Sequence, residues 1–253
     1  MWSKNKQKWV RSLAIKKYRD REGCFIAEGP KVVEELLVAY KPLLFVATHE
    51  WAESQPNLDA ETYILSAEEL ARVSLMQAPQ QVLAVFHKPT EGNVPLSLGK
   101  ELSSQLVLLL DGIQDPGNLG TIVRVANWFG ITHLVCSPDT ADVYSPKVVQ
   151  ATMGALSKVG VHYTKLTEFL DTVSPEIPIY GTFLEGKNIY EAPLTSGGLI
   201  IMGNEGQGIS PEVAEHVNHK LYIPPFPLGN THVESLNVAI ATAITIAEFR
   251  RRK

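Results

Sequence analysis

Three glycine-rich segments of the chain hold residues whose types and spacing could do chemistry. The first, residues 111–124, has the sequence DGIQDPGNLGTIVR. Gly112 and Gly117 have the spacing of a phosphate-binding loop, but Asn118 and Leu119 stand where that loop needs lysine and then serine or threonine. The glycines also lack the GxGxxG order of a dinucleotide site. A nucleotide triphosphatase and an NAD-dependent enzyme are therefore disfavoured.

A cation follows this turn on a predicted helix. Arg124 and Asn127 are three residues apart and fall on a different face from the apolar side chains, which are Leu119, Ile122, Val123, Ala126 and Phe129. A single arginine on a helix is usually a solvated surface charge. Gly120, one turn before Arg124, leaves room for a ligand beside the guanidinium, and this favours a functional role.

The second segment, residues 199–210, has the sequence LIIMGNEGQGIS and contains one carboxylate, Glu205. Three glycines after a buried strand let bare peptide groups approach a small ligand closely. Ser210 followed by Pro211 also predicts the start of a helix, with the serine as its N-cap.

The third segment, residues 223–237, has the sequence IPPFPLGNTHVESLN and leads into an alanine-rich helix that Ser235 or Asn237 could cap. It contains His232. A separate HxxH pair, His216 and His219, has no third ligand nearby in sequence, so we expect no metal site.

Buried strands must position these segments. From residue 105, apolar runs alternate with helical patterns. We expect strands over residues 106–111, 133–136, 159–163, 179–184, 199–203 and 221–223, and helices over 118–129, 145–153, 167–173 and 234–251. This alternation predicts an α/β domain with a mainly parallel sheet covered on both faces. Ligands of such sheets bind at the carboxyl ends of the strands.

Residues 1–90 predict a smaller α/β domain. Its expected elements are helices over 7–18, 30–39 and 67–75, and strands over 24–27, 43–48, 62–65 and 82–86. Residues 91–104 are polar, contain proline and glycine, and predict a linker. The larger domain is then 105–253.

Charge is distributed unevenly along the chain. The net charge is −4, but the first 21 residues carry +7 and the last four carry +4, which leaves −15 on residues 22–249. Cations in the last turn suit a helix C-terminus. The basic N-terminal segment favours an anionic partner.

Composition narrows the class of protein further. The longest aliphatic run, residues 106–110, is far shorter than the ~20 residues of a membrane span, and the N-terminus resembles no signal peptide. We therefore expect a cytoplasmic protein without a membrane partner. Cys24 and Cys136 lack a CxxC partner, so we expect reduced thiols and no zinc.

The three segments together resemble the signature motifs of the SpoU (TrmH-like) family of RNA 2′-O-ribose methyltransferases, in the SPOUT superfamily. The strongest matches are residues 118–124, 203–208 and 235–237. Residues 13–29 are similar to the substrate-binding domain that many members carry. The resemblance implies a trefoil knot in the C-terminal domain, a homodimer, S-adenosylmethionine as cofactor, and ribosomal or transfer RNA as substrate.

The resemblance also implies roles for individual residues. The reaction centre would be formed by Asn118, Arg124, Glu205, Ser235 and Asn237. S-adenosylmethionine would be held mainly by main-chain groups of Gly203, Ile223 and Leu236, with Thr182 as a weaker candidate. The connection 225–234 is longer than is usual in the family, so Leu228 or Gly229 could replace a family contact.

Arg124 is the base that the resemblance implies. A guanidinium has a pKa above ~12 and is normally a pure donor, so a clamp on phosphate or on the developing alkoxide is the alternative. The basic N-terminal residues would bind RNA phosphates. They are Lys4, Lys6, Lys8, Arg11, Lys16, Lys17 and Arg19.

Two alternative functions stay open. A SPOUT enzyme that methylates an RNA base is the nearer one, and the pairing of Asn118 with Arg124 together with residues 235–237 favours ribose instead. A non-catalytic RNA-binding protein of the same fold is the other, and the intact polar residues of the three motifs disfavour it.

Overall fold

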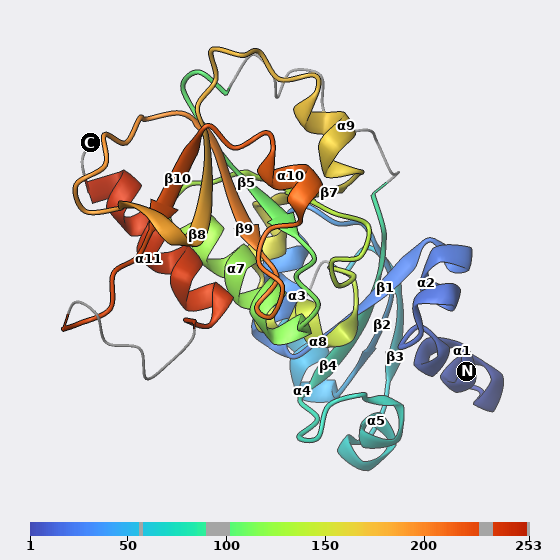
Figure 1. The fold of residues 1–253 in the computed structure, drawn as a ribbon. Helices are drawn as coiled ribbons and strands as arrows, with labels where there is room; N and C mark the ends of the chain where they lie inside the picture. Colours follow the sequence, from blue (N-terminus) through green and yellow to red (C-terminus); the bar gives the residue numbers. More distant parts are fainter. Residues whose placement is uncertain (56–57, 90–101, 228–234, 252–253) are drawn as a thin grey trace. The chain divides into compact units, whose positions relative to one another are not determined.

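A computed structural model describes residues 1–55, 58–89, 102–227 and 235–251 of the chain (Figure 1). The chain divides into two compact units. The first comprises Met1–Glu91 with Asp142–Lys158, and the second comprises Gly92–Ala141 with Val159–Lys253. Each unit is built around its own β-sheet.

The first unit has a four-stranded sheet in the order β1-β4-β2-β3. The β2–β3 pair is parallel and the other two pairs are antiparallel. The strands are β1 (Cys24–Glu28), β2 (Pro42–Ala47), β3 (Glu61–Ile64) and β4 (Val82–His87). Helices before and between them are α1 (Lys4–Ser12), α2 (Lys16–Glu22), α3 (Pro30–Leu36), α4 (His49–Glu53) and α5 (Ala67–Val73). The predicted α/β character of this part is confirmed.

The basic N-terminal helix differs from the prediction. The sequence predicts one helix over 7–18, but the structure has α1 and α2, separated at residues 13–15. Leu13 enters the core, whereas Ile15 is extended and 56% exposed. The carbonyls of Leu13 and Ala14, which the break leaves without helical partners, accept hydrogen bonds from Arg19 Nη1 at 2.8 and 2.7 Å.

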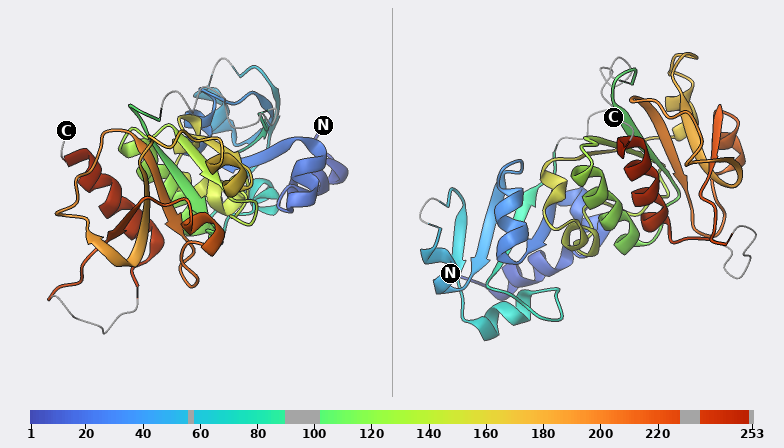
Figure 2. Two further views of the ribbon diagram at one scale, coloured as in Figure 1. Left: turned by 45° about the horizontal axis from the view of Figure 1, so that its top comes forward. Right: turned by 90° about the vertical axis from the view of Figure 1, so that its left-hand side faces the viewer.

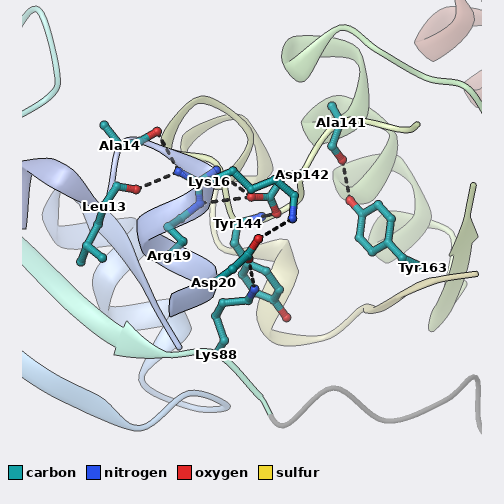
Figure 3. A network of polar contacts seen from close by, with 10 residues as sticks. All are labelled: Leu13, Ala14, Lys16, Arg19, Asp20, Lys88, Ala141, Asp142, Tyr144 and Tyr163. Carbon is teal, nitrogen blue, oxygen red and sulfur yellow. Dashed lines mark hydrogen bonds and ion pairs between the residues drawn. The ribbon is translucent and has the colours of Figure 1, made fainter. Parts of the chain in front are cut away.

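A segment that is distant in sequence completes the first unit. Residues 142–158 contain α8 (Pro146–Thr152) and the 3₁₀ helix η1 (Ala155–Ser157), and α8 packs on β1. Arg19 donates from Nη2 and Nε to Asp142 Oδ2 at 2.6 and 3.1 Å (Figure 3). The ring of Tyr144 lies 4.9 Å from that of Phe25. This segment thus folds with the first unit, although it lies inside the predicted domain 105–253.

The second unit has a six-stranded sheet in the order β10-β8-β9-β5-β6-β7, and every pair is parallel. The strands are β5 (Leu106–Asp111), β6 (His133–Cys136), β7 (Gly160–Tyr163), β8 (Ile179–Asn188), β9 (Gly198–Gly203) and β10 (His219–Tyr222). The helices are α7 (Pro116–Trp128), α9 (Leu166–Leu170), α10 (Pro211–Ala214) and α11 (Val238–Arg251). The predicted parallel sheet is confirmed, whereas the trefoil knot stays a prediction.

Helices cover both faces of this sheet. Val107 and Leu109 of β5, with Leu199 and Ile201 of β9, pack in one apolar cluster with residues of α9 and α10. On the other side of the sheet α7 and α11 lie side by side (Figure 2). All six residues of β5 are buried, as the apolar run predicts for a central strand.

The strand order reverses at β5. The chain runs from β5 to β6 and β7 on one side, whereas β8, β9 and β10 lie on the other. The carboxyl ends of β5 and β9 are therefore neighbours, and Asp111 pairs in register with Gly203. Ligands of open α/β sheets bind at such a reversal.

Candidate active site

The first and second glycine-rich segments leave the sheet at this reversal. Asp111 ends β5, and the chain continues through a turn at Gly112 into α7. Gly203 ends β9 and leads into a tight loop, in which Asn204 and Gly208 form an antiparallel bridge. A Cβ on Gly203 would lie 2.2 Å from the carbonyl carbon of Gly208, so only glycine fits there.

Helix α7 brings Asn118 to the site. Asp115, the N-cap residue, accepts a hydrogen bond from the backbone N–H of Asn118 at 2.8 Å, and Pro116 occupies the first turn. The helix therefore begins at Pro116, before the predicted residue 118.

The side chains of Glu205, Asn118 and Asn237 form one chain of hydrogen bonds. Asn118 Nδ2 donates to Glu205 Oε1, and Asn118 Oδ1 accepts from Asn237 Nδ2 at 2.9 Å. Asn237 Oδ1 in turn accepts from the backbone N–H groups of Ala239 and Ile240 at 3.0 and 3.3 Å. Three segments that are far apart in sequence thus meet through their polar side chains.

Asn237 also explains where the last helix begins. Because its side chain accepts from Ala239 and Ile240, α11 starts at Val238 instead of the predicted residue 234. At the other end of the two parallel helices, Arg250 donates to the carbonyl oxygens of Phe129 and Gly130 at 2.8 and 3.3 Å. Contacts at both ends hold α11 against α7.

Two residues of the predicted reaction centre do not join this chain of hydrogen bonds. Arg124 is exposed on α7, and within the described part of the chain its guanidinium has no hydrogen bond or ion pair. Ser235 is exposed and likewise has no hydrogen bond to another described residue. Both side chains are therefore available to a bound substrate.

Of the residues predicted to hold the cofactor, those that the structure describes follow or flank the carboxyl ends of β8, β9 and β10. Thr182 Oγ1 donates weakly to the carbonyl of Ile201 at 3.5 Å. Ile223 follows β10 and is half-buried, whereas Leu236 is 47% exposed. Leu228 and Gly229, like His232, lie outside the described residues.

Main-chain groups at this edge suit a cofactor that is held mainly by peptides. Among described residues, the backbone N–H groups of Ile223 and Leu236 have no hydrogen-bond partner. Gly203 and the two glycines of the loop after it, Gly206 and Gly208, present peptide groups without bulky side chains. These residues fit an adenosyl group, which needs both peptide donors and apolar contact.

Sequence reasoning missed three residues that build the site. Asp115 could have been found from the Asp-Pro pair, which is a helix-start signal. Asp111 and Asn204 gave no such signal, because their partners are distant in sequence. Ser210 occupies the predicted N-cap of α10, but its hydroxyl donates to Asp111 Oδ2 at 2.8 Å and makes no cap bond.

The predicted RNA-binding cations divide into two groups. Lys6 donates to Glu61 at 2.6 Å, Arg11 donates to the carbonyl of Arg72 at 2.8 Å, and Lys16 pairs with Asp20 at 2.7 Å. Arg19 differs most from the expectation, because it is 2% exposed and its guanidinium is used inside the unit. Its burial excludes direct contact with phosphate.

Three other cations of this segment are free. Lys4, Lys8 and Lys17 are exposed, and within the described part of the chain they form no ion pair. These three are the ones available to an external anion.

The HxxH pair is occupied by other contacts. His216 Nε2 lies 3.0 Å from Asp171 Oδ1, and the ring of His219 stacks on Tyr180 with centroids 4.9 Å apart. In the described ranges no group of three His, Cys, Asp or Glu side chains is placed to share a metal ion.

No helix in the described ranges is both long enough and apolar enough to span a bilayer.

Comparison with known proteins identifies the family. The family model described as SpoU rRNA methylase matches residues 105–247. The chain belongs to the SpoU rRNA methylase family. A second model, the MRM3-like substrate binding domain, matches residues 4–84 of this SpoU methylase. The predicted family is thus confirmed.

Relatives that are similar over nearly the whole chain support the same family. The SpoU methylase is 32% identical over 244 residues to the Bacillus subtilis 23S rRNA (guanosine(2553)-2′-O)-methyltransferase RlmP, covering 95% of this chain and 94% of that one. A structure from Porphyromonas gingivalis, assigned to the TrmH family of RNA methyltransferases, is 44% identical with a TM-score of 0.89, and each chain is covered fully.

A third relative holds the predicted cofactor. The AdoMet-bound rRNA methyltransferase from Sinorhizobium meliloti is 26% identical with a TM-score of 0.84, covering 100% of this SpoU methylase and 97% of that chain. The predicted class of enzyme, an RNA 2′-O-methyltransferase that uses S-adenosylmethionine, is therefore confirmed.

Proposed function

We propose that this SpoU methylase transfers a methyl group from S-adenosylmethionine to the ribose 2′-hydroxyl of a guanosine in large-subunit ribosomal RNA. The choice of 23S rRNA and of guanosine rests on the activity for which the B. subtilis relative is named. The structural observation that carries the proposal is the hydrogen-bonded chain of Asn237, Asn118 and Glu205 at the carboxyl ends of β5 and β9.

The chain's own residues would position the reacting groups. S-adenosylmethionine, when bound, supplies a methyl group already activated by its sulfonium. Gly203, Ile223 and Leu236 would bind it through main-chain groups, with Thr182 beside them. Orientation of a hydroxyl toward a reactive partner lowers the activation barrier by several kcal/mol. Asn118 and Asn237, whose amides are already oriented, would contribute in this way.

Arg124 would stabilise negative charge on the RNA. Its side chain is exposed and makes no hydrogen bond to the other described residues. Because a guanidinium remains protonated at neutral pH, Arg124 would donate to the phosphate beside the target ribose and to the 2′-oxygen, while the hydroxyl proton passes to solvent water. Ser235 would donate or accept at the same ribose.

The N-terminal unit would hold the RNA. Its match to a substrate-binding domain and its free cations support this role. As part of the proposal we retain the functional division into a substrate domain (1–90), a linker (91–104) and a methyltransferase domain (105–253), although residues 142–158 fold with the first unit. An rRNA substrate would also locate the reaction in the cytoplasm.

The active unit would be a homodimer. Trp128 at the end of α7 is 84% exposed and Ile240 on the neighbouring α11 is 53% exposed. Large apolar side chains on two adjacent helices favour burial against a second copy. Light scattering coupled to gel filtration should give a dimer, and Trp128→Glu should shift it to monomer.

The decisive experiment determines which position of the RNA receives the labelled methyl group. Total RNA from a deletion strain is incubated with the enzyme and methyl-labelled S-adenosylmethionine, the ribosomal and transfer RNA are separated, and each is hydrolysed in alkali. A methylated 2′-oxygen cannot attack its phosphodiester, so the label should remain in a dinucleotide whose first base is guanine. Label in mononucleotides would indicate base methylation instead, and label only in transfer RNA would overturn the rRNA assignment.

A further inference from the structure

The loop that carries Glu205 is tied at both ends to the end of β5. At its start, Asn204 Nδ2 donates to the carbonyl oxygen of Gly112 at 2.7 Å. At its end, the backbone N–H and the hydroxyl of Ser210 both donate to Asp111 Oδ2, at 2.7 and 2.8 Å. Two consecutive residues of the first motif therefore anchor a seven-residue loop of the second.

Asn204 also sets the shape of the loop itself. Its Oδ1 accepts from the backbone N–H groups of Gly206 and Gln207 at 2.9 and 3.1 Å. Its own backbone exchanges hydrogen bonds with Gly208 at 3.0 and 2.8 Å. One side chain thus orders the two peptide groups that follow Glu205 and fastens them to Gly112.

The anchor is rigid. Asp111 is 8% exposed, and Gly112 has φ +69°, a conformation that favours glycine. The N–H of Gly112 donates to Ser137 Oγ at 2.8 Å. A Cβ on Gly112 would lie 3.1 Å from the carboxylate of Asp139 and 3.7 Å from the Cβ of Asn204. The turn therefore has little freedom to shift.

We propose that Asp111 and Asn204 are positioning residues for methyl transfer. By fixing the loop 204–210 at both ends, they determine where Glu205 meets Asn118 and where the loop's peptides receive the cofactor. This inference rests on the proposed function, since it assigns that loop to S-adenosylmethionine. Neither residue needs to touch substrate.

A matched pair of variants tests the role of Asn204. Asn218 makes the same kinds of bond, accepting from the N–H of Ile179 at 2.8 Å and donating to the carbonyl of Ile177 at 3.4 Å. It lies at the opposite, amino ends of β8 and β10. Asn204→Ala should raise the dissociation constant for S-adenosylmethionine at least tenfold by calorimetry, whereas Asn218→Ala should change it less than twofold.

Two further readouts separate positioning from simple loss of stability. Hydrogen exchange at Gly206 and Gln207 should speed up in Asn204→Ala and stay unchanged in Asn218→Ala. Asn204→Asp keeps the acceptor for those two amides but loses the donor to Gly112, so it should show protected amides and weakened cofactor binding. The melting temperatures of all three variants are recorded alongside.

Asp111 is tested by a graded pair. Asp111→Asn retains an oxygen for Ser210, so its cofactor affinity should fall between those of wild type and Asp111→Ala. Should Asp111→Ala fail to fold, Ser210→Ala, which removes only the hydroxyl bond, serves as the second variant and should weaken cofactor binding by two- to fivefold.

The outcomes distinguish this inference from the proposed function. Equal cofactor affinities in Asn204→Ala and Asn218→Ala would overturn the positioning role. A wild-type chain that binds S-adenosylmethionine but leaves rRNA unlabelled would overturn the proposed function while leaving the comparison of affinities valid.

Discussion

Asn237 donates a hydrogen bond to Asn118 over 2.9 Å, although 119 residues separate the two in sequence. The opposite end of the Asn237 amide accepts from the first N–H groups of α11. One side chain therefore caps a helix and orients the residue that contacts Glu205. Its two functions can be separated by a single substitution.

Asn237→Asp should separate them. The carboxylate can still accept from Ala239 and Ile240, and a negative charge at a helix N-terminus is favourable by about 0.3–1 kcal/mol. It cannot donate to Asn118. We expect an unchanged or higher melting temperature and a loss of kcat of about tenfold, the worth of one hydrogen bond. Asn237→Ala, which loses both functions, should also melt lower. Wild-type kcat in Asn237→Asp would show that the donation is dispensable.

Asn118→Asp tests the link to Glu205. The change replaces the amide that donates to Glu205 with a second carboxylate. Two adjacent carboxylates raise the pKa of one of them. The folded state therefore binds an extra proton at low pH, and stability should fall as the pH rises through that raised pKa. We expect Asn118→Asp to be less active than Asn118→Ala at pH 8 and to recover in part near pH 5. A pH-independent ratio of the two activities would contradict this.

Arg124→Lys tests whether a planar donor is required. Lysine keeps the charge but loses the fork that binds two oxygens at once. We expect kcat to fall by roughly 10²-fold, which is the effect of removing a hydrogen-bond donor to an oxygen that becomes negatively charged in the transition state. RNA affinity should change little. Arg72→Lys, at an exposed arginine in the last turn of α5, is the control and should behave as wild type. Near-normal turnover in Arg124→Lys would exclude both roles considered for this residue.

Local pattern predicted the second unit well. The apolar runs of β5 and β9 follow from burial on both faces of a parallel sheet, and the position of α7 follows from its apolar face. Its true start at Pro116 is set by Asp115, which the Asp-Pro pair could have indicated.

The other features of the fold and the site depend on contacts between residues that are far apart in sequence, and local patterns do not predict such contacts. Whether α1 and α2 are one helix depends on Arg19 satisfying the carbonyls at the break, and that in turn depends on Asp142, 123 residues away. No local pattern predicts such a pair. The joining of Asn118 with Glu205 likewise depends on the order of strands in the sheet, which periodicity does not predict. The family resemblance implied that the two residues meet, without giving that order.

The free cations of the first unit give a direct test of RNA binding. Charge reversal at Lys4, Lys8 and Lys17 should weaken RNA binding, and should lower the slope of log K against log salt by about 2–3 if each neutralises one phosphate. The control, Lys6→Gln with Lys16→Gln, removes cations already paired with Glu61 and Asp20. Filter binding at several salt concentrations measures both. An equal loss in the control would mean that the paired cations also reach the RNA.

Glu28 should make the stability of the first unit depend on pH. This carboxyl group is 5% exposed at the end of β1, where it accepts from the hydroxyl of Ser74 and from the N–H of Leu75 at 2.9 Å. Burial raises its pKa above the usual value, because the charged form is poorly solvated. The stabilising contribution of its protonated form is thus complete below the unfolded pKa of about 4.3 and is lost as the pH rises through the folded pKa.

Glu28→Gln imitates the protonated group, since its amide can accept from Leu75 and donate to Ser74. Its stability should therefore lack this pH dependence. Thermal unfolding from pH 4 to pH 8 should show the variant gaining on wild type as the pH rises, with the smallest difference at pH 4. A difference that is constant over this range would mean that the Glu28 carboxylate is as well stabilised in the fold as in water. In that case its two hydrogen bonds, and not its burial, would dominate.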